Sequence, residues 1–352
     1  MAKKRAMGEL VRSNIKQLAP QDAYHLTTPT INHHIASSSP VFDLMPRRGC
    51  GPIGLPGGKI TELYGINGAG KTIFAARVCA AVQALGGFAT WIASEGIDEV
   101  AKEHLVGDMN LLDKIGVIRD DPDRWIYAEV FTLEAAFGVA QGAIIAVHDS
   151  PLPSVTVIDA VSSLEASENA MNNKGMGDGK SAAAGAKTCH QFARSGIQYY
   201  LSGSNSILII IRHQTENPRP FAGNEKTSHG SAFDFATWLR LRFRSKPLTK
   251  SDTDKTKLGS WITITCTKSK MGGHGWKVSM PWYWDTGWDP GMEILTWLLD
   301  NCEDIKKDAN GRVIIPELGK NKFPSQWRKD YATDEGLQHE MQTILLERFR
   351  QQ

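Results

Sequence analysis

The stretch Gly65-Ile-Asn-Gly-Ala-Gly-Lys-Thr72 fits the pattern G-x-x-x-x-G-K-[S/T], and its surroundings predict how it folds. An apolar strand pattern at 59–64 precedes it, and a helix is expected from Thr72 to Leu85. Glycines let the backbone curl so that successive N–H groups point inward, and the helix N-terminus that follows adds positive potential. Strand, glycine-rich turn and helix in this order predict a loop that binds the phosphates of a nucleotide.

The residues of this loop have expected parts in binding ATP and Mg²⁺. The backbone around the phosphates would come from Gly65, Asn67, Gly68, Ala69 and Gly70. Lys71 should reach the β- and γ-phosphates and take part in catalysis, while the hydroxyl of Thr72 should bind Mg²⁺. A glycine-rich turn that fits the pattern by chance is the alternative.

Two carboxylates follow predicted strands and should lie at the same edge of a sheet. Asp159 ends the buried run 155–159, the arrangement that holds Mg²⁺ in P-loop ATPases. Glu95 follows the strand pattern 88–94 and is placed to orient or deprotonate the attacking water. The alternatives are that Asp159 only ends a strand and that Glu95 caps the next helix or faces solvent.

Two further polar groups are candidates for catalysis. Arg212, His213 and Gln214 follow the buried run 207–211, and because side chains alternate along a strand they cannot all face the γ-phosphate. His213 is favoured over Gln214 as the residue that senses it; a structural strand end is the alternative. Lys268 and Lys270 follow the strand pattern 260–267 and project to one side of an extended chain. Taken alone, they describe a solvated strand end.

Composition sets the outer limits. The chain has 352 residues, 41% of them hydrophobic, and a net charge of +2, so any nucleic-acid binding must come from local patches. Its five cysteines are scattered without a C-x-x-C pair, which argues against a zinc site or a disulfide framework and fits a reducing cytosol. No run of residues approaches the roughly 18 apolar positions that a membrane span requires. A cytoplasmic protein without a membrane role is expected.

From Lys59 onward, strand and helix patterns alternate, which predicts an α/β fold with a mainly parallel central sheet flanked by helices. An N-terminal arm is expected at 1–48, the core at 49–284 and a small, mostly helical region at 285–352. Within the core, one helix is expected at 181–202. Two stretches, 165–180 and 215–229, are unusually long for loops in a compact domain, and such loops usually carry function or are disordered.

The ordered set of motifs resembles the RecA family of DNA strand-exchange ATPases over about residues 38–290. The set comprises Gly65 to Thr72, Glu95, Asp159, the polar group at 212–214, the loop 221–225 and Lys268-Ser-Lys270. Within that family, the segments at 186–188, 211–213, 268–270 and 287–290 look most like the phage recombinases of the UvsX type.

The resemblance implies a RecA-like P-loop ATPase core that polymerises into a helical filament, with ATP between neighbouring protomers. Lys268 and Lys270 would then reach the γ-phosphate bound by the next subunit. The two long loops would bind DNA, with four cations near phosphates and one aromatic ring near bases. These residues are Lys174, Lys180, Arg219, Lys226 and Phe221. The arm resembles in position the segment that docks on the adjacent subunit, with Ile31 and Ile35 as anchors.

The resulting expectation is a DNA-dependent ATPase that coats single-stranded DNA and exchanges strands with double-stranded DNA. Single-strand-binding and mediator proteins are possible partners. A ring helicase motor on the same fold is one alternative, although neither an arginine finger nor a separate assembly domain is evident. A non-exchanging paralogue that uses ATP only as an assembly switch is the other, and Glu95 argues against it.

Overall fold

The computed structural model describes residues 34–47, 54–94, 112, 114–167, 179–194, 197–216, 225–227, 233–250 and 254–351. At its centre lies a sheet of ten described strands in the order β12-β11-β10-β9-β3-β7-β6-β4-β5, with β8 paired to β7. The strands are β3 (Lys59–Gly65), β4 (Phe88–Ala93), β5 (Trp125–Glu129), β6 (Ser154–Asp159), β7 (Ser206–Glu216), β8 (Glu225–Thr227), β9 (Leu239–Thr249), β10 (Lys257–Ser269), β11 (Lys277–Tyr283) and β12 (Gly287–Trp288). The pairings from β9 through β5 are parallel, which confirms the α/β prediction, and the strands beyond β9 are antiparallel.

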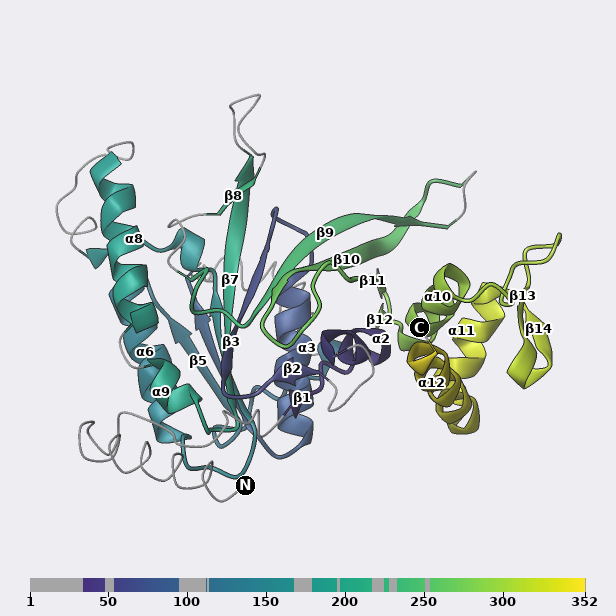
Figure 1. Ribbon diagram of the computed structural model, residues 1–352, viewed down its shortest axis with the longest axis horizontal. Helices are drawn as coiled ribbons and strands as arrows, with labels where there is room; N and C mark the ends of the chain where they lie inside the picture. Colours follow the sequence, from purple (N-terminus) through teal and green to yellow (C-terminus); the bar gives the residue numbers. More distant parts are fainter. Residues whose placement is uncertain are drawn as a thin grey trace, which may run out of the picture.

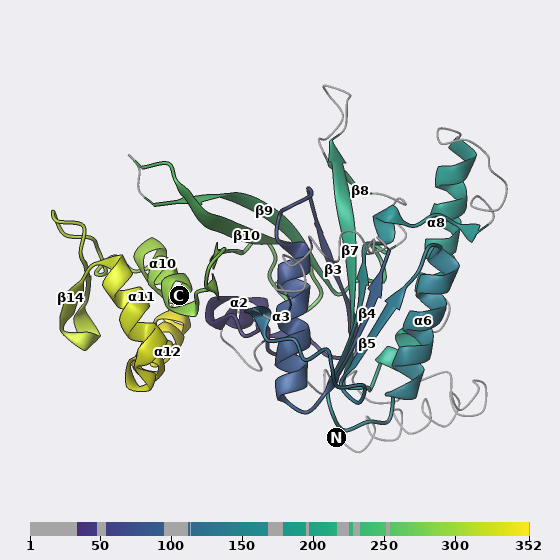
Figure 2. The same cartoon turned by 180° about the vertical axis from the view of Figure 1, so that it is seen from behind.

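Helices cover both faces of this sheet (Figures 1 and 2). The helices around the sheet are α2 (Pro40–Leu44), η1 (Met45–Arg47), α3 (Lys71–Ala84), α6 (Leu133–Ala146), η2 (Val161–Ser163), α8 (Gly179–Arg194) and α9 (Ile197–Leu201). Along β7, Ile207, Ile209 and Ile211 join the core beneath α3, whereas Leu208 and Ile210 join the core beneath α6, α8 and α9. This alternation assigns each strand side chain to one of two faces, the α3 face and the α6 face.

The C-terminal region forms a separate lobe beside α2 and the end of the sheet (Figure 1). It contains α10 (Pro290–Asn301), β13 (Val313–Ile315), η3 (Pro316–Leu318), β14 (Lys320–Lys322), α11 (Pro324–Thr333) and α12 (Glu335–Arg350). The β13–β14 hairpin was not expected from the sequence. The helix expected at 181–202 is two helices, α8 and α9, and the residue types between them, Ser195 and Gly196, have lower helix propensity than alanine.

The described part of the N-terminal arm packs against its own subunit. The short strands β1 (His34–Ile35) and β2 (Leu55–Pro56) pair with each other. Ile35 is 1% exposed and belongs to the core beneath α3. The expectation that Ile35 docks on a neighbour is therefore wrong, because its side chain is already buried here, and Ile31 lies outside the described residues.

A buried polar cluster joins the arm to the C-terminal lobe. Glu293, on α10, accepts hydrogen bonds from the hydroxyl of Ser39 (2.5 Å), the N–H of Val41 (3.2 Å) and the indole N–H of Trp288 (3.1 Å). Burial raises the pKa of Glu293 to about 7, although these donors and the nearby Arg77 favour its charged form. Arg77, on α3, donates to the carbonyl of Ser38 at 2.8 Å. One side chain therefore fixes the arm, α10 and the loop before it.

We expect Glu293→Ala to lower the free energy of unfolding by about 3 kcal/mol, because several buried donors lose their acceptor. Urea unfolding followed by circular dichroism measures this loss. Glu340→Ala, at an exposed position of α12, is the control and should change stability by less than about 0.5 kcal/mol. Equal effects of the two substitutions would mean that the cluster does not hold the lobe.

Candidate functional site

The glycine-rich loop lies between the end of β3 and the start of α3, as its sequence predicts. Gly70 precedes the first residue of α3 with φ of 93°, and a Cβ built there would lie 2.5 Å from Cδ1 of Ile262. At Gly65 a Cβ would lie 2.4 Å from the carbonyl oxygen of Phe243. Glycine is required at both positions because β9 and β10 press against the loop.

Lys71 points back into this loop. Its Nζ donates to the carbonyl oxygens of Gly65 (3.0 Å) and Ile66 (2.8 Å), and only 4% of the residue is exposed. Burial lowers the pKa of Lys71 to about 8, although the carboxylate of Asp159 opposes the change. The ammonium group therefore sits in a backbone cradle with neutral partners, where the phosphates of a nucleotide would supply the missing negative charge.

We expect the affinity for ATP to decline as the pH rises above about 8. Below the pKa of Lys71 the ammonium is charged and can pair with phosphate; above it, binding requires uptake of a proton, so affinity falls by up to about tenfold per pH unit. Titration with a fluorescent ATP analogue across this pH range measures the slope. Lys71→Arg stays charged throughout and should give a flat profile, whereas equal slopes would assign the effect to another group.

The two residues predicted to bind Mg²⁺ lie in contact. The hydroxyl of Thr72 donates to Oδ2 of Asp159 at 2.8 Å, and Asp159 has the same parity along β6 as Val155 and Val157, on the α3 face. Within the described residues no group of three or more His, Cys, Asp or Glu side chains could enclose a metal. A hydroxyl and one carboxylate fit Mg²⁺, which binds few protein groups and keeps waters and phosphate oxygens as its other ligands.

Glu95 lies outside the described residues, but the strand end before it is fixed. The hydroxyl of Ser94 accepts the N–H of Ala160 at 2.8 Å, and the N–H of Ser94 donates to the carbonyl of Asp159 at 3.0 Å. The described chain therefore ends at Ser94, directly beside the predicted metal ligand. The role of Glu95 as the group that activates water stays a prediction.

The polar group at the end of β7 divides between the two faces. His213 pairs with Gly65 in the parallel register and shares the parity of Ile211, which places it on the α3 face with Asp159. Its N–H donates to the hydroxyl of Ser162 at 2.8 Å. Arg212 and Gln214 have the opposite parity. This alternation places His213, and not Gln214, on the same face as Asp159, while the role of His213 as the residue that senses the γ-phosphate stays a prediction.

A buried ion network, which the sequence did not reveal, occupies the α6 face. Arg212 is fully buried and lies 3.1 Å from Glu62 on β3, and Glu62 also lies 3.1 Å from Arg240 on β9. Arg240 extends the network to Asp234 at 3.3 Å. Glu62 is a single acidic residue within an apolar strand pattern. That pattern did not indicate that side chains from β3, β7 and β9 form ion pairs at this position. Arg212 is thereby occupied on the side away from the nucleotide loop.

Lys268 and Lys270 lie on this second face, remote from their own nucleotide loop. Nζ of Lys268 donates to the carbonyl of Asp234, and Nζ of Lys270 donates to the carbonyl of Phe235 at 2.7 Å. Lys268 pairs with Arg240, which pairs with Glu62, three residues and so roughly 10 Å before Gly65 along the sheet. The two lysines therefore donate to neighbouring carbonyls on one face of the sheet and cannot reach the phosphates bound by their own chain.

Two aromatic residues, Phe235 and Trp238, lie next to the lysine pair in the fold. Phe235 is 82% exposed, a large cost for a phenyl ring that nothing in its own described chain covers. The ring of Trp238 has Nζ of Lys59 at 4.4 Å and Nζ of Lys270 at 5.8 Å from its centroid. Burial, and then the charge of Lys270, lowers the pKa of both Lys59 and Lys268. Neither Phe235 nor Trp238 was expected at this site, although two aromatic residues soon after a long loop were a usable signal.

The predicted DNA contacts cannot be placed. Lys174, Arg219 and Phe221 lie outside the described residues. Lys180 falls in α8 and Lys226 in β8, but their side chains are outside the described part. What the structure gives is the position of the loop ends, one on α8 and the other on the hairpin β7–β8 (Figure 1).

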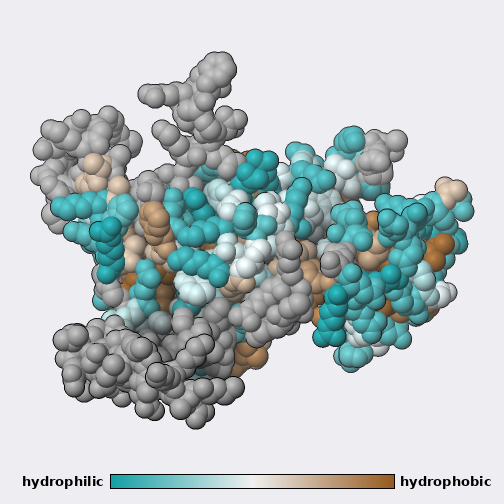
Figure 3. All heavy atoms as spheres, in the orientation of Figure 1, coloured by the Kyte–Doolittle hydropathy of each residue, from teal (hydrophilic) through white to brown (hydrophobic). Residues whose placement is uncertain are grey.

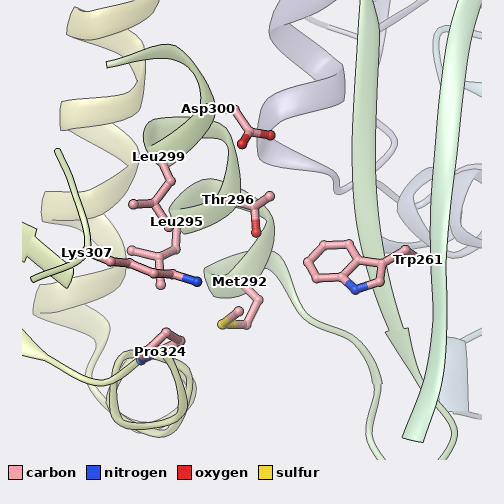
Figure 4. A pocket seen from close by; sticks show the side chains of 8 residues that line it. All are labelled: Trp261, Met292, Leu295, Thr296, Leu299, Asp300, Lys307 and Pro324. Atoms are coloured by element: carbon pink, nitrogen blue, oxygen red, sulfur yellow. The ribbon is translucent and has the colours of Figure 1, made fainter. Parts of the chain in front are cut away.

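A pocket of about 380 Å³ opens between the core and the C-terminal lobe (Figure 4). Trp261 on β10 faces Met292 and Thr296 on α10 across it, and the side chain of Lys307 reaches in from the other wall. On the face shown in Figure 3, hydrophilic side chains cover most of this lobe. The pocket has no glycine-rich backbone to bind a triphosphate, so it is separate from the nucleotide site.

The site and the fold together define a P-loop ATPase. A strand, a glycine-rich loop and a helix with a buried lysine follow one another, and Thr72 on that helix contacts Asp159 at the end of β6. The model of the RecA N-terminal domain family matches residues 31–288, and the chain belongs to the RecA family of recombinases. It is 28% identical to the protein RecA of Malacoplasma penetrans over 310 residues, which are 86% of this chain and 84% of that one.

Further relatives give the same family. The protein RecA of Ureaplasma parvum is 28% identical over 250 residues, 70% of this chain and 67% of the relative. That of Aquifex pyrophilus is 29% identical over 220 residues, 62% of this chain and 57% of the relative. No helix in the described part of the chain combines the length and the apolar character that crossing a bilayer needs.

Proposed function

We propose that this protein is an ATP-dependent recombinase that polymerises on single-stranded DNA and exchanges strands with a homologous duplex. The observation that carries this proposal is the separation between the two halves of the catalytic apparatus. Lys71, Thr72 and Asp159 lie on the α3 face, while Lys268 and Lys270 lie beyond the sheet on the other face. A complete site therefore needs two copies of the chain.

The two lysines place two positive charges close together, as expected for one side of an anion-binding site. Among the described residues, both ammonium groups donate to neutral backbone carbonyls, and the pKa of Lys268 is lowered first by burial and then by Lys270. A γ-phosphate from the adjacent protomer would relieve this repulsion and, during hydrolysis, would gain from the two charges. Covering Phe235 by the same neighbour would remove its exposed ring from water.

The lysines also touch the end of the second long loop. The carbonyls that they bind belong to Asp234 and Phe235, and the described chain resumes at Phe233 after residues 228–232. A neighbour's phosphate that draws the lysines away would release these carbonyls. We infer that binding of ATP at the interface changes the position of the second loop, which links nucleotide binding to DNA binding.

The test of this function uses the purified wild-type chain. Single-stranded DNA should stimulate ATP hydrolysis, and electron microscopy should show helical filaments with DNA and a slowly hydrolysed ATP analogue. Strand exchange between a circular single strand and a homologous linear duplex, with Mg²⁺ present, completes the test. Stimulation and filaments without any strand exchange would favour a non-exchanging paralogue, and the absence of all three would remove the proposal.

The finer likeness to UvsX-type phage recombinases is part of this proposal and rests on short segments such as 211–213 and 268–270. The ring-helicase alternative predicts unwinding of a forked duplex instead of filaments. For the assembly-switch alternative, the comparison is ATP turnover in the wild type and in Glu95→Gln, which should differ only if Glu95 activates water. A cytoplasmic location and the help of single-strand-binding or mediator proteins remain proposals of the same kind.

A further inference from the structure

Glu134 binds residues on both sides of the first long loop. It lies in the first turn of α6, where its Oε2 accepts the N–H and the hydroxyl of Ser167, each at 2.8 Å. Its Oε1 accepts the hydroxyl of Thr188, on α8, at 3.0 Å. Ser167 comes before residues 168–178 and Thr188 comes after them. One carboxylate therefore joins the two flanks of a segment that itself lies outside the described residues.

Backbone contacts hold the first flank against the start of the same helix. The N–H of Leu133 donates to the carbonyl of Glu165 at 2.9 Å, next to a bridge between Thr132 and Glu165. Leu164 and Ala166 are each 2% exposed. The chain that leads into the loop is thus anchored in the core, and Glu134 is the side chain that extends this anchoring across to α8.

Aromatic stacking holds the second flank against α6 as well. The ring of Phe137 stacks on that of Phe192, on α8, with centroids 4.1 Å apart and planes 6° apart. Phe137 also packs edge-to-face on Phe233, which follows the second long loop, at 6.2 Å. Described residues that follow each long loop therefore pack on α6, and the polar contacts of Glu134 fix the relative position of the two flanks of the first.

The carboxylate is suited to this part. Partial burial raises the pKa of Glu134, but the N–H and hydroxyl of Ser167 and the hydroxyl of Thr188 together lower it below its ordinary value. The positive end of α6 also favours a negative charge there. Glu134 is therefore ionised at neutral pH and accepts all three hydrogen bonds.

We propose that Glu134 is a positioning residue for DNA binding, which holds the two flanks of the first long loop at a fixed separation. The inference rests on the proposed function, because that function assigns DNA to this loop. Because Glu134 is charged, the direction of the change in DNA affinity distinguishes this role from simple electrostatic repulsion. An exposed carboxylate near DNA repels phosphates, so removing the charge alone would strengthen DNA binding. Loss of the hydrogen bonds that hold the flanks would weaken it.

The experiment compares Glu134→Gln with wild type in binding a fluorescent single-stranded oligonucleotide in the presence of an ATP analogue. The dissociation constant should rise about five- to tenfold, because glutamine keeps only one acceptor oxygen. The DNA concentration for half-maximal ATPase stimulation should rise by the same factor, with the maximal rate and the KM for ATP unchanged. A general structural defect would alter those two quantities as well.

Two variants control for charge and for the contact. Glu165→Gln removes an exposed charge two residues before Ser167 and should bind DNA at least as tightly as wild type. Ser167→Ala should reproduce Glu134→Gln, and the double variant should be no weaker than either single one, because both remove one contact. DNA affinity in Glu134→Gln equal to or above that of Glu165→Gln would overturn the proposal.

We call the contacts of Glu134 with Ser167 and Thr188 the clamp, and hydrogen exchange in the absence of DNA measures this clamp independently of DNA binding. The amide of Ser167, which donates to Glu134, should exchange at least about tenfold faster in Glu134→Ala, which has no side-chain acceptor, than in wild type. Unchanged exchange would overturn the clamp. If the wild-type chain binds no DNA, the proposed function fails, and with it the role in DNA binding, while exchange still reports whether Glu134 holds the flanks together.

Discussion

Lys268→Ala/Lys270→Ala should hydrolyse ATP at least about a hundredfold more slowly than wild type, because cations that meet a developing phosphate charge contribute this much or more. ATP binding should persist, since Lys71, Thr72 and Asp159 are intact on the other face of the sheet. Phosphate release with saturating single-stranded DNA measures turnover, and a fluorescent ATP analogue measures binding.

Mixing two inactive variants decides whether the lysines act on the neighbour's nucleotide. Asp159→Asn supplies intact lysines and Lys268→Ala/Lys270→Ala supplies an intact nucleotide loop. If the site lies between protomers, an equal mixture should recover up to about a quarter of the wild-type rate. Random assembly makes about one interface in four complete, with an intact nucleotide loop on one side and intact lysines on the other. A mixture that stays as inactive as its components would show that each chain uses its own lysines.

Asp159→Asn alone should lower kcat by about a thousandfold. A bound metal ion stabilises the charge of the transition state by several kcal/mol, and this stabilisation is lost with the metal. The amide oxygen is a weaker ligand for Mg²⁺ than a carboxylate, and the hydroxyl of Thr72 loses its charged partner. Steady-state turnover with saturating Mg²⁺ and single-stranded DNA measures the effect.

The control for this substitution is Asp120→Asn, at an exposed position before β5, which removes the same charge far from the loop. It should leave turnover within about twofold of wild type. Thermal unfolding should separate a folding defect from loss of metal. An Asp159→Asn protein that turns over ATP like Asp120→Asn would mean that another group holds the metal.

Local sequence predicted the nucleotide half of the site because its parts are contiguous. Gly65 to Thr72 needs only a strand before it and a helix after it, and both formed as expected. Asp159 ends a buried strand, and carboxyl ends of parallel strands meet at one edge, so its contact with Thr72 followed from strand order. The family resemblance then supplied the expectation for Lys268 and Lys270.

Other features depended on register and could not be read from spacing. Glu62, Arg212 and Arg240 lie on three strands and meet only because β7, β3 and β9 are adjacent in a particular alignment. Ile35 was expected to dock on the adjacent subunit, but it is buried in the core of its own chain. The sequence around an isoleucine in a polar arm does not indicate which subunit's core buries that side chain. Glu134 joins Ser167 and Thr188, which are 21 positions apart from each other and further still from Glu134 in the sequence.

The chain by itself thus determined the class of fold, the glycine-rich loop and the meeting of Thr72 with Asp159, since each arises from short-range periodicity and a strand end. Only the tertiary structure decided on which face of the sheet each polar side chain lies. That choice places Lys71 and Lys270 on opposite faces, because strand parity and neighbouring strands, which no local pattern encodes, set the direction of every side chain.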